Sequence, residues 1–489
     1  MALDTIPKQE GGKLKAVASG TLPSGVPVVV NSDGTVSVIG SSGSNLTPSP
    51  IPSSVATFNA GGTTQNIRVA SDPNNSGKFV VVYKDLANSG YGTAAVGTVS
   101  GTSISFGSEV IFKSGEIAGV GLSFDPNTSS KLVVTYQAND APYYCSVKVG
   151  TISGTSISFG SEYTVSDSNL PLVAFDPNSA NKFVFAYCDP SYVGKALIGT
   201  VSGTSISFGS ASTYETGPVY QNTIAADPNN AGKFIIAYQD SGNSSYGTCV
   251  VGTISGTSIS FGTASVFYSG NLSSFSSAFD PNNSGKFVVS YRNYANSQYG
   301  TAIVGTVSGS SATFGSPVVF NAGQTEVTSV SFDENNSNVF AIGYEDVADS
   351  YYGKVVFGTI SGTSVSFSSE VIFNEARTDF LAVAFDPNQT SSLFIAYRDG
   401  GDGQNGKAIL STASNLTSEN YIGISTGGAV ADGGNATVGI IGSVSDEQTG
   451  LTAGQQYYVQ TDGTLSETPA DPSVLAGTAI SATKMLVKT

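Results

Sequence analysis

Tyrosine and aspartate recur together in loops such as KDLANSGYG and QDSGNSSYG, and these residue types can recognise a saccharide. Aromatic rings stack on the apolar faces of sugars, while carboxylates and amides bind the hydroxyl groups. The same residues also suit a protein contact. A structural role is the third interpretation, with tyrosines covering sheet edges and aspartates capping turns. The candidate ligand-binding residues are Tyr91, Tyr144, Tyr192, Tyr246, Tyr299, Tyr352, Asp85, Asp189, Asp240, Asp346 and Asp399.

Catalytic and metal-binding patterns are weak in this chain. It contains no histidine, which excludes histidine-based triads and the usual zinc sites. Its three cysteines form no CxxC pattern and no disulfide framework. Each recurring Asp-Pro-Asn turn offers one carboxylate, too few oxygens for a calcium site. No loop is distinctive enough to hold a catalytic carboxylate pair, so we expect no catalytic residue, no metal and no cofactor.

The four arginines, Arg68, Arg292, Arg377 and Arg398, are spread over the chain, which also lacks tryptophan. A sialidase-type propeller needs an arginine cluster for a carboxylate and usually carries turns ending in tryptophan. We therefore do not expect a sialidase, and we expect the protein not to be an enzyme.

The loops belong to an internal repeat of 51 or 53 residues. In one copy, a strand ending at Asp227 is followed by a Pro-Asn-Asn turn, KFIIAY, a long loop, TCVVGTIS, a Ser-Gly-Thr turn and SISFG. Apolar runs and period-two alternation between turn residues predict four antiparallel strands. The repeat is marked by Asp72, Asp125, Asp176, Asp227, Asp280, Asp333 and Asp386, and by a Tyr eleven residues later that we expect to pack between repeats.

Four-stranded units of this length predict a radial arrangement, because one unit cannot bury its apolar faces alone. The predicted fold is all-β: a seven-bladed β-propeller of about 51–53-residue four-stranded blades, with small β-rich N- and C-terminal modules. A β-solenoid is the alternative. The segment VATFNAG, residues 55–61, is expected to complete the last blade, so that no sheet edge stays open.

Hairpin connections place the two kinds of loop on opposite faces of the predicted disc. The Asp-Pro-Asn and Ser-Gly-Thr turns barely vary between repeats, whereas the long Tyr-rich loops differ. Function concentrates in loops held by a rigid scaffold. The variable face is therefore the predicted functional face.

Three domains are predicted: residues 1–50 as an N-terminal β-hairpin and attachment segment, 55–420 as the propeller, and 421–489 as a small C-terminal β domain. The segments 25–37 and 454–466 align without gaps, and each predicts a hairpin with an Asp-Gly turn, at Asp33 and at Asp462. Because an isolated hairpin is marginal in water, each is expected to pack on another surface.

The net charge of −16 and the lack of a basic cluster disfavour nucleic acid as a partner. The N-terminal sequence has no apolar core of signal-peptide length, and no segment is long and apolar enough to span a membrane. We expect synthesis in a cytoplasm, without a signal peptide and without membrane insertion.

GLTAGQQYYVQTDGTLSE with VLAGTAISATKMLVK, and the opening KAVASGTLPSGVPVVVNSDGTVSVI, resemble segments of structural proteins from tailed bacteriophages, particularly marine ones. The repeats are similar to those of phage fibre-like and decoration-like proteins. The resemblance implies a virion structural protein whose propeller is anchored to capsid, neck or tail through its termini. Its partners would be other virion proteins, copies of itself in a homo-oligomer or larger assembly, and host-surface glycans. A free or surface lectin-like adhesin is the alternative, and a glycan-cleaving enzyme is less favoured.

Overall fold

The computed structural model describes residues 12–19, 21–31, 34–39, 47–48, 55–100, 103–139, 143–166, 168–389, 391–414, 416, 420–431, 433–460, 463–469 and 473–488. These residues form antiparallel β-sheets, with two short 3-10 turns, η1 (Ser241–Asn243) and η2 (Tyr294–Asn296), and no α-helix. Within these ranges, no helix has the length and hydropathy of a membrane span.

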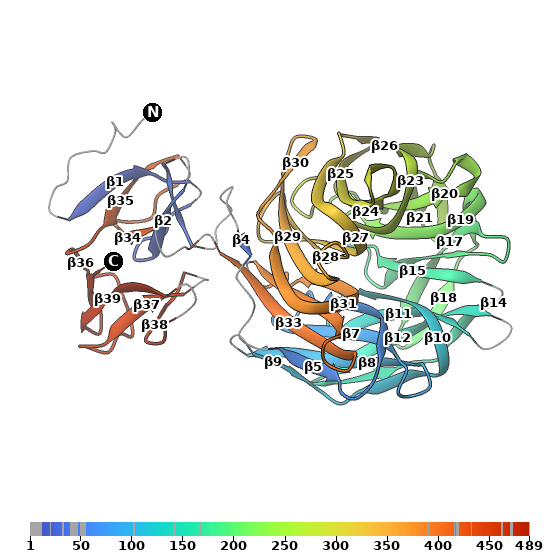
Figure 1. Cartoon of the computed structure of the whole chain (residues 1–489), viewed down its shortest axis with the longest axis horizontal. Helices are drawn as coiled ribbons and strands as arrows, with labels where there is room; N and C mark the ends of the chain where they lie inside the picture. The colour runs from blue at the N-terminus through green and yellow to red at the C-terminus, as the bar shows by residue number, and fades with distance from the viewer. Residues whose placement is uncertain are drawn as a thin grey trace. The chain divides into compact units, whose positions relative to one another are not determined.

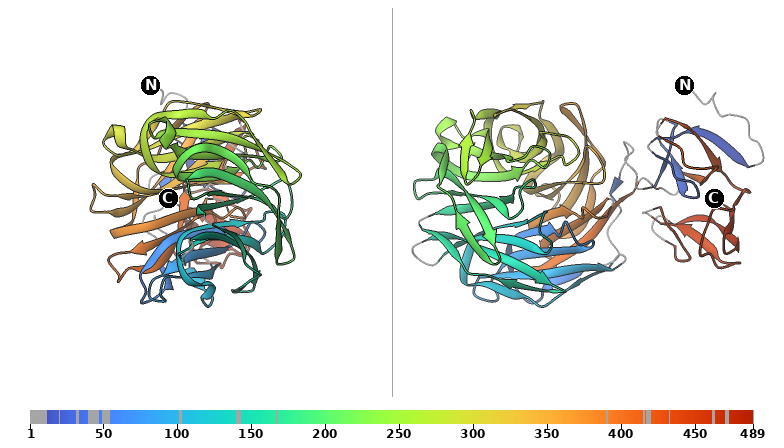
Figure 2. Two further views of the ribbon diagram at one scale, coloured as in Figure 1. Left: turned by 90° about the vertical axis from the view of Figure 1, so that its right-hand side faces the viewer. Right: turned by 180° about the vertical axis from the view of Figure 1, so that it is seen from behind.

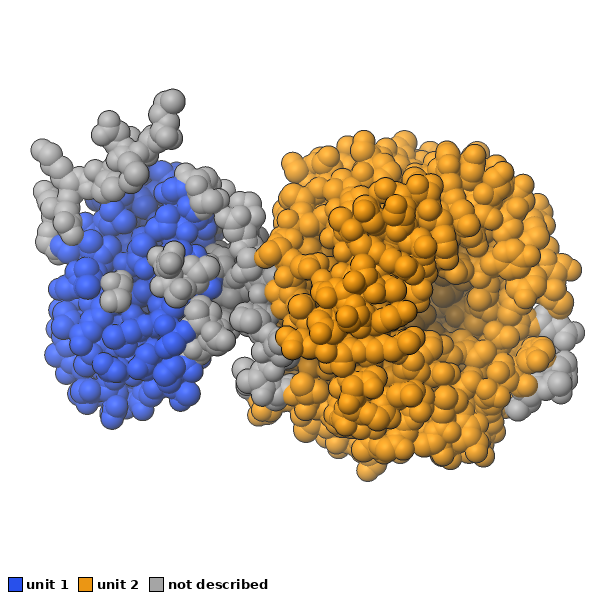
Figure 3. Space-filling view, viewed as in Figure 1, with its two compact units in different colours: residues 1–50, 412–489 blue, residues 51–411 orange. Residues whose placement is uncertain are grey.

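The chain divides into two compact domains. The repeat domain, Ile51–Ser411, is unit 2 of Figure 3. The terminal domain, unit 1, combines Met1–Pro50 with Thr412–Thr489. This differs from the predicted division, in which the N- and C-terminal segments are separate modules.

The repeat domain is propeller-like, with its small sheets arranged around a common centre (Figures 1 and 2). The first strands of the repeats are β6 (Thr64–Ser71), β10 (Val110–Phe124), β15 (Asn169–Phe175), β19 (Ser212–Ala226), β23 (Ser265–Phe279), β27 (Val318–Phe332) and β31 (Val371–Phe385). The second strands are β7 (Lys78–Asp85), β11 (Lys131–Ala138), β16 (Lys182–Cys188), β20 (Lys233–Asp240), β24 (Lys286–Asn293), β28 (Val339–Asp346) and β32 (Ser392–Asp399).

The third strands are β8 (Tyr91–Ser100), β12 (Tyr144–Ser153), β17 (Val193–Ser202), β21 (Tyr246–Ser255), β25 (Tyr299–Ser308), β29 (Tyr352–Ser361) and β33 (Asn405–Ser414). Short outer strands follow as β9 (Ser103–Phe106), β13 (Ser156–Phe159), β18 (Ser205–Phe208), β22 (Ser258–Phe261), β26 (Ser311–Phe314) and β30 (Ser364–Phe367). Between β13 and β15, the separate strand β14 (Tyr163–Ser166) pairs with β12.

Burial explains the strand patterns. The apolar run of β20 is buried between neighbouring sheets, which accounts for its lack of alternation, whereas β22 alternates because one of its faces is exposed. The Tyr near the end of each second strand is buried in all seven repeats, as predicted from its spacing.

Each long strand serves two repeats. In β23, Val266 pairs with Thr248 of the preceding repeat, and Phe279 pairs with Phe287 of its own repeat. The covalent chain therefore joins the outer edge of one sheet to the inner edge of the next.

The Asp-Pro-Asn turns also link neighbouring repeats. The Asp side chain accepts a hydrogen bond from the backbone N–H two residues later in all seven turns. The Asn at that position donates to a backbone carbonyl in the next turn, over 2.9–3.3 Å. These Asn residues are Asn74, Asn127, Asn178, Asn229, Asn282, Asn335 and Asn388.

The last repeat makes the same contacts with the first. Asn388 Nδ2 donates to the Asp72 carbonyl over 3.2 Å, and Gly77 N donates to Asp386 Oδ2 over 2.6 Å. Strand β5 (Ala56–Asn59) pairs with β33, as predicted for residues 55–61.

The terminal domain contains two five-stranded sheets with the same topology. The interrupted module consists of β1 (Lys13–Val17), β2 (Pro27–Val30), β3 (Val36–Val38), β34 (Tyr421–Thr426) and β35 (Asn435–Gly439). The continuous module consists of β36 (Val444–Ser445), β37 (Gln456–Val459), β38 (Leu465–Ser466), β39 (Val474–Ser481) and β40 (Lys484–Val487). If each module's strands are numbered in chain order, both sheets have the order 1-5-4-2-3. The short strand β4 (Thr47–Pro48) lies between β3 and the repeat domain in the chain and pairs with β33.

Equivalent hydrogen bonds recur in both modules. Gly25 N donates to the Ser425 carbonyl, and Gly454 N donates to the Ala479 carbonyl, over 2.9 and 2.8 Å. The two predicted hairpins are β2–β3 and β37–β38. Their turn residues Asp33 and Asp462 lie outside the described residues, as do Gly101 and Thr102 of the first Ser-Gly-Thr turn.

The two modules share one hydrophobic core that includes Val29, Ile424, Tyr457 and Met485. The repeat domain is thus inserted between the third and fourth strands of one copy of a duplicated module. The sequence alignment detected the hairpins but not the strands that complete each sheet.

Candidate functional site

The five predicted loop aspartates cap their own loops. Each accepts a backbone N–H through Oδ1, over 2.9–3.2 Å. These are Asp85, Asp189, Asp240, Asp346 and Asp399. The geometry matches the turn-capping alternative, in which Oδ1 of each carboxylate is used for a hydrogen bond within its own loop.

The groups that surround these aspartates differ. Asp346 forms an ion pair with Lys354 over 3.0 Å. Burial acts to raise the pKa of Asp189, but its ion pair with Lys195 and two backbone donors hold that pKa below the usual value. Burial, with Glu215 nearby, raises the pKa of Asp240.

Five of the six predicted tyrosines begin a third strand and are partly buried: Tyr91, Tyr144, Tyr246, Tyr299 and Tyr352. All five stand opposite the residue that ends the second strand. In three repeats that residue is a predicted aspartate, as Asp85 is opposite Tyr91. The Tyr144 hydroxyl accepts a hydrogen bond from Lys113 Nζ over 2.7 Å.

Tyr192 is the predicted tyrosine with the most open ring, 38% exposed, and its ring lies 5.0 Å from that of Tyr220. Tyr220, Tyr143 and Tyr294 are more exposed still, and all three were missed by the sequence analysis. Tyr143 directly precedes its third strand, at the position of Tyr192, whereas Tyr220 lies within β19 and Tyr294 within η2. None of the three belongs to the set of loop tyrosines that the sequence analysis selected.

Charged residues gather near the long loops of the fifth, sixth and seventh repeats. Arg292 forms an ion pair with Glu326 over 2.9 Å, and Arg398 Nε donates to Asp379 Oδ2 over 3.1 Å. Glu345 is 1% exposed, and its Oε1 has no hydrogen-bond partner among the described residues. Burial, reinforced by Asp379 and Glu326, raises the pKa of Glu345 to about 8.

Two cavities lie along the first strands, one nearer the long loops and one nearer the Asp-Pro-Asn turns. The turn-side cavity, of about 430 Å³, is lined mainly by small residues, phenylalanines and the turn prolines. Glu334 occupies the position held by proline in the other six turns. Figure 3 shows the repeat domain hollowed at its centre.

The loop-side cavity has a volume of about 470 Å³, within the range typical of small-molecule sites. Each first strand contributes the residues four and six positions before its repeat Asp. The residues at the fourth position are Arg68, Gly121, Leu172, Thr223, Ser276, Ser329 and Ala382. Those at the sixth are Asn66, Gly119, Leu170, Gln221, Ser274, Val327 and Phe380.

β-bulges shape this cavity. The register of all seven first strands shifts beside the sixth position. Five non-glycine residues there adopt φ between +44° and +54°, including the β-branched Val327. Such conformations carry strain and cluster at functional sites.

The two cavity-lining positions vary widely between repeats, with six residue types at the fourth position and seven at the sixth. The sequence analysis missed them because it compared loops, whereas these residues lie inside strands. Their signal was the loss of repeat identity from the seventh to the fourth position before the repeat Asp.

No protein-family profile and no curated protein matches the chain. Among solved structures, Sqt1 from Saccharomyces cerevisiae is similar with a TM-score of 0.45 and 12% identity, covering 80% of this chain and 99% of Sqt1. Sqt1 from Chaetomium thermophilum has a TM-score of 0.45 and 14% identity, with coverages of 73% and 87%. The BP39L lectin from Burkholderia pseudomallei has a TM-score of 0.51 and 10% identity, with coverages of 77% and 99%. The likeness to the lectin is one of fold alone.

Proposed function

We propose that the chain is a non-enzymatic adhesive component of a tailed-phage virion. In this proposal the terminal domain attaches to other virion proteins, and the repeat domain is a closed seven-bladed β-propeller that binds host-surface saccharides.

The observation that carries the proposal is the insertion of the whole repeat domain between the third and fourth strands of the interrupted module. A domain inserted in this way is tethered to its carrier by both of its ends. The resemblance of the terminal segments to phage structural proteins supports a virion as the particle to which the terminal domain attaches.

Closure of the propeller is supported by the bonds from the last repeat to the first, which match those at the internal junctions. In both cases an Asp carboxylate accepts a backbone N–H from the following repeat. A closed ring leaves no inner sheet edge available for aggregation.

A free lectin-like adhesin is the second candidate. The fold likeness to a lectin and the exposed rings of Tyr143, Tyr192 and Tyr294 favour it. The two candidates share saccharide binding and differ in attachment to particles.

Quantitative mass spectrometry of particles purified from the source separates them. We expect the full chain in particles at a fixed copy number, and we expect purified full chain, but not residues 51–411 alone, to bind particles that lack it. Absence from particles, with saccharide binding retained, would favour the free adhesin. Attachment by residues 51–411 alone would contradict the anchoring role of the terminal domain.

A further inference from the structure

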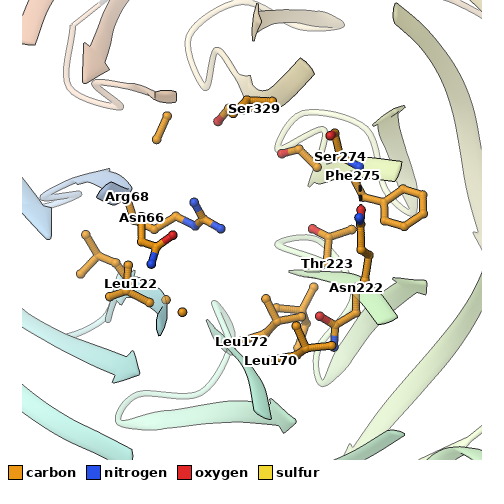
Figure 4. Close-up of a pocket in the computed structure, with 18 of the residues that line it drawn as sticks. Asn66, Arg68, Leu122, Leu170, Leu172, Asn222, Thr223, Ser274, Phe275 and Ser329 are labelled. Carbon is orange, nitrogen blue, oxygen red and sulfur yellow. Dashed lines mark hydrogen bonds between the residues drawn. The ribbon is translucent and has the colours of Figure 1, made fainter. Parts of the chain in front are cut away.

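One positively charged side chain lies inside the loop-side cavity. Among the residues that line this cavity, Arg68 is the only one with a charged side chain. It extends from β6 beside Asn66, across from Asn222, Thr223 and Phe275 (Figure 4). The chain carries 36 acidic residues against 20 basic ones, so a cavity with one cation and no acid departs from its overall charge.

The Arg68 guanidinium is not neutralised. Its Nη1 donates to the carbonyl of the adjacent Ile67 over 2.9 Å, and it forms no ion pair with any described residue. The Arg68 side chain is exposed to the open cavity, and an arginine remains protonated. An accessible guanidinium without a counterion is free to bind an anion through charge-assisted hydrogen bonds.

The neighbouring repeats leave space around the guanidinium. The residues equivalent to Arg68 in the two adjacent repeats are small. They are Gly121 in the second repeat and Ala382 in the seventh. At the level of Asn66, the next repeat has Gly119. The side chain nevertheless stays accessible, because these neighbours contribute almost no side-chain volume.

The rest of the wall offers two kinds of contact. Hydroxyl and amide groups come from Asn66, Gln221, Thr223 and Ser329, while apolar surface comes from Leu170, Leu172 and Phe380. The ring of Phe275 points away from Arg68 (Figure 4). Gln221 Oε1 accepts a hydrogen bond from Ser274 N over 2.6 Å. This bond fixes the orientation of the amide, so that its NH₂ group points away from Ser274 N. Fixed polar groups beside an apolar surface suit a hydroxylated ring.

We propose that the loop-side cavity binds an acidic saccharide, with the Arg68 guanidinium holding its carboxylate and the opposite wall contacting its ring. A guanidinium binds a carboxylate through two parallel hydrogen bonds. The inference rests on the proposed saccharide binding of the repeat domain and is independent of attachment to a virion.

The test is isothermal titration calorimetry of the full chain with D-glucuronate, D-glucose and acetate. Three variants are compared with the unaltered chain: Arg68→Gln, Arg68→Lys, and the control Arg377→Gln. Arg377 lies outside the cavity lining, where its Nε pairs with Asp379 over 3.2 Å. Thermal unfolding of each variant verifies that the fold is retained.

We expect saturable binding of D-glucuronate, with glucose and acetate at least about tenfold weaker. Arg68→Gln should weaken glucuronate binding by about tenfold or more, and Arg68→Lys should weaken it less, because lysine keeps the charge without the planar fork. Arg377→Gln should leave it unchanged.

Any of four results would overturn the inference. Glucuronate binding unaffected by Arg68→Gln, or absent from the unaltered chain, removes the role of Arg68. Equal affinity for acetate indicates a simple anion site, and equal affinity for glucose indicates neutral-sugar recognition. In the last case the proposed saccharide-binding function survives although this inference fails, and particle attachment is measured separately.

Discussion

The two ends of the first strands follow opposite rules. On the turn side, the same Asp and Asn make the same hydrogen bonds in repeat after repeat. On the loop side, the residues that line the cavity range from glycine to arginine and phenylalanine. The difference teaches that the repeat fixes its folding contacts at one end of the sheet and leaves the other end free to vary.

The largest expected effect is on the turn side, where the hydrogen bonds are the same in every repeat. Asp386→Ala removes the acceptor of Gly77 N and of Asn388 N from a carboxylate that is 1% exposed. We expect the free energy of unfolding to fall by about 3 kcal/mol, because buried donors lose a charged partner. Urea denaturation followed by circular dichroism measures this change.

Asp125→Ala is the matched control at an internal junction, where Asp125 Oδ2 accepts Asn181 N over 2.8 Å. Similar losses for the two variants are expected if the junctions are equivalent. A negligible loss for Asp386→Ala alone would contradict ring closure.

A dependence on pH, smaller within any one pH unit than the loss expected for Asp386→Ala, is expected at Glu345 on the loop side. The raised pKa of Glu345, about 8, means that the folded chain keeps a proton that the unfolded chain releases near its ordinary value of 4.5. This contribution to stability is therefore present at low pH and decreases as pH rises from about 4.5 to about 8, by up to about 1.4 kcal/mol per pH unit.

Glu345→Gln should flatten this pH dependence. The measurement is the difference between variant and unaltered chain in urea midpoints from pH 5 to pH 8, since other carboxyl groups contribute to both. Parallel curves would show that Glu345 ionises normally.

The smallest effect concerns backbone strain. Val327 has φ +44°, a conformation that asparagine tolerates better, and Asn66 occupies the equivalent position in the first repeat. Val327→Asn should therefore raise the free energy of unfolding by about 0.5 kcal/mol. Val319→Asn, at a 39% exposed strand position, should lower it slightly. Destabilisation by Val327→Asn would show that the valine packs better than its backbone suggests.

The sequence predicted what repetition encodes. KFIIAY and SISFG specify strands because their apolar patterns recur, and the pairing of residues near Val55 with β33 was predicted because VATFNAG resembles an internal segment. The cavity was not predictable in this way, because Arg68 and Asn66 reach it through a bulge that no strand pattern reveals. Exposed Tyr294 was missed because it has no tyrosine counterpart in the equivalent 3-10 turn of the preceding repeat, where η1 begins at Ser241.

The inserted position of the repeat domain also has a consequence for synthesis. Val28 of β2 pairs with Gly423 of β34, so the interrupted module can form only after the ribosome has translated every repeat. A chain released early would lack the strands that complete this sheet, whatever the state of its repeats. Formation of the interrupted module therefore acts as a length check, which limits a complete terminal domain to chains translated past the last repeat.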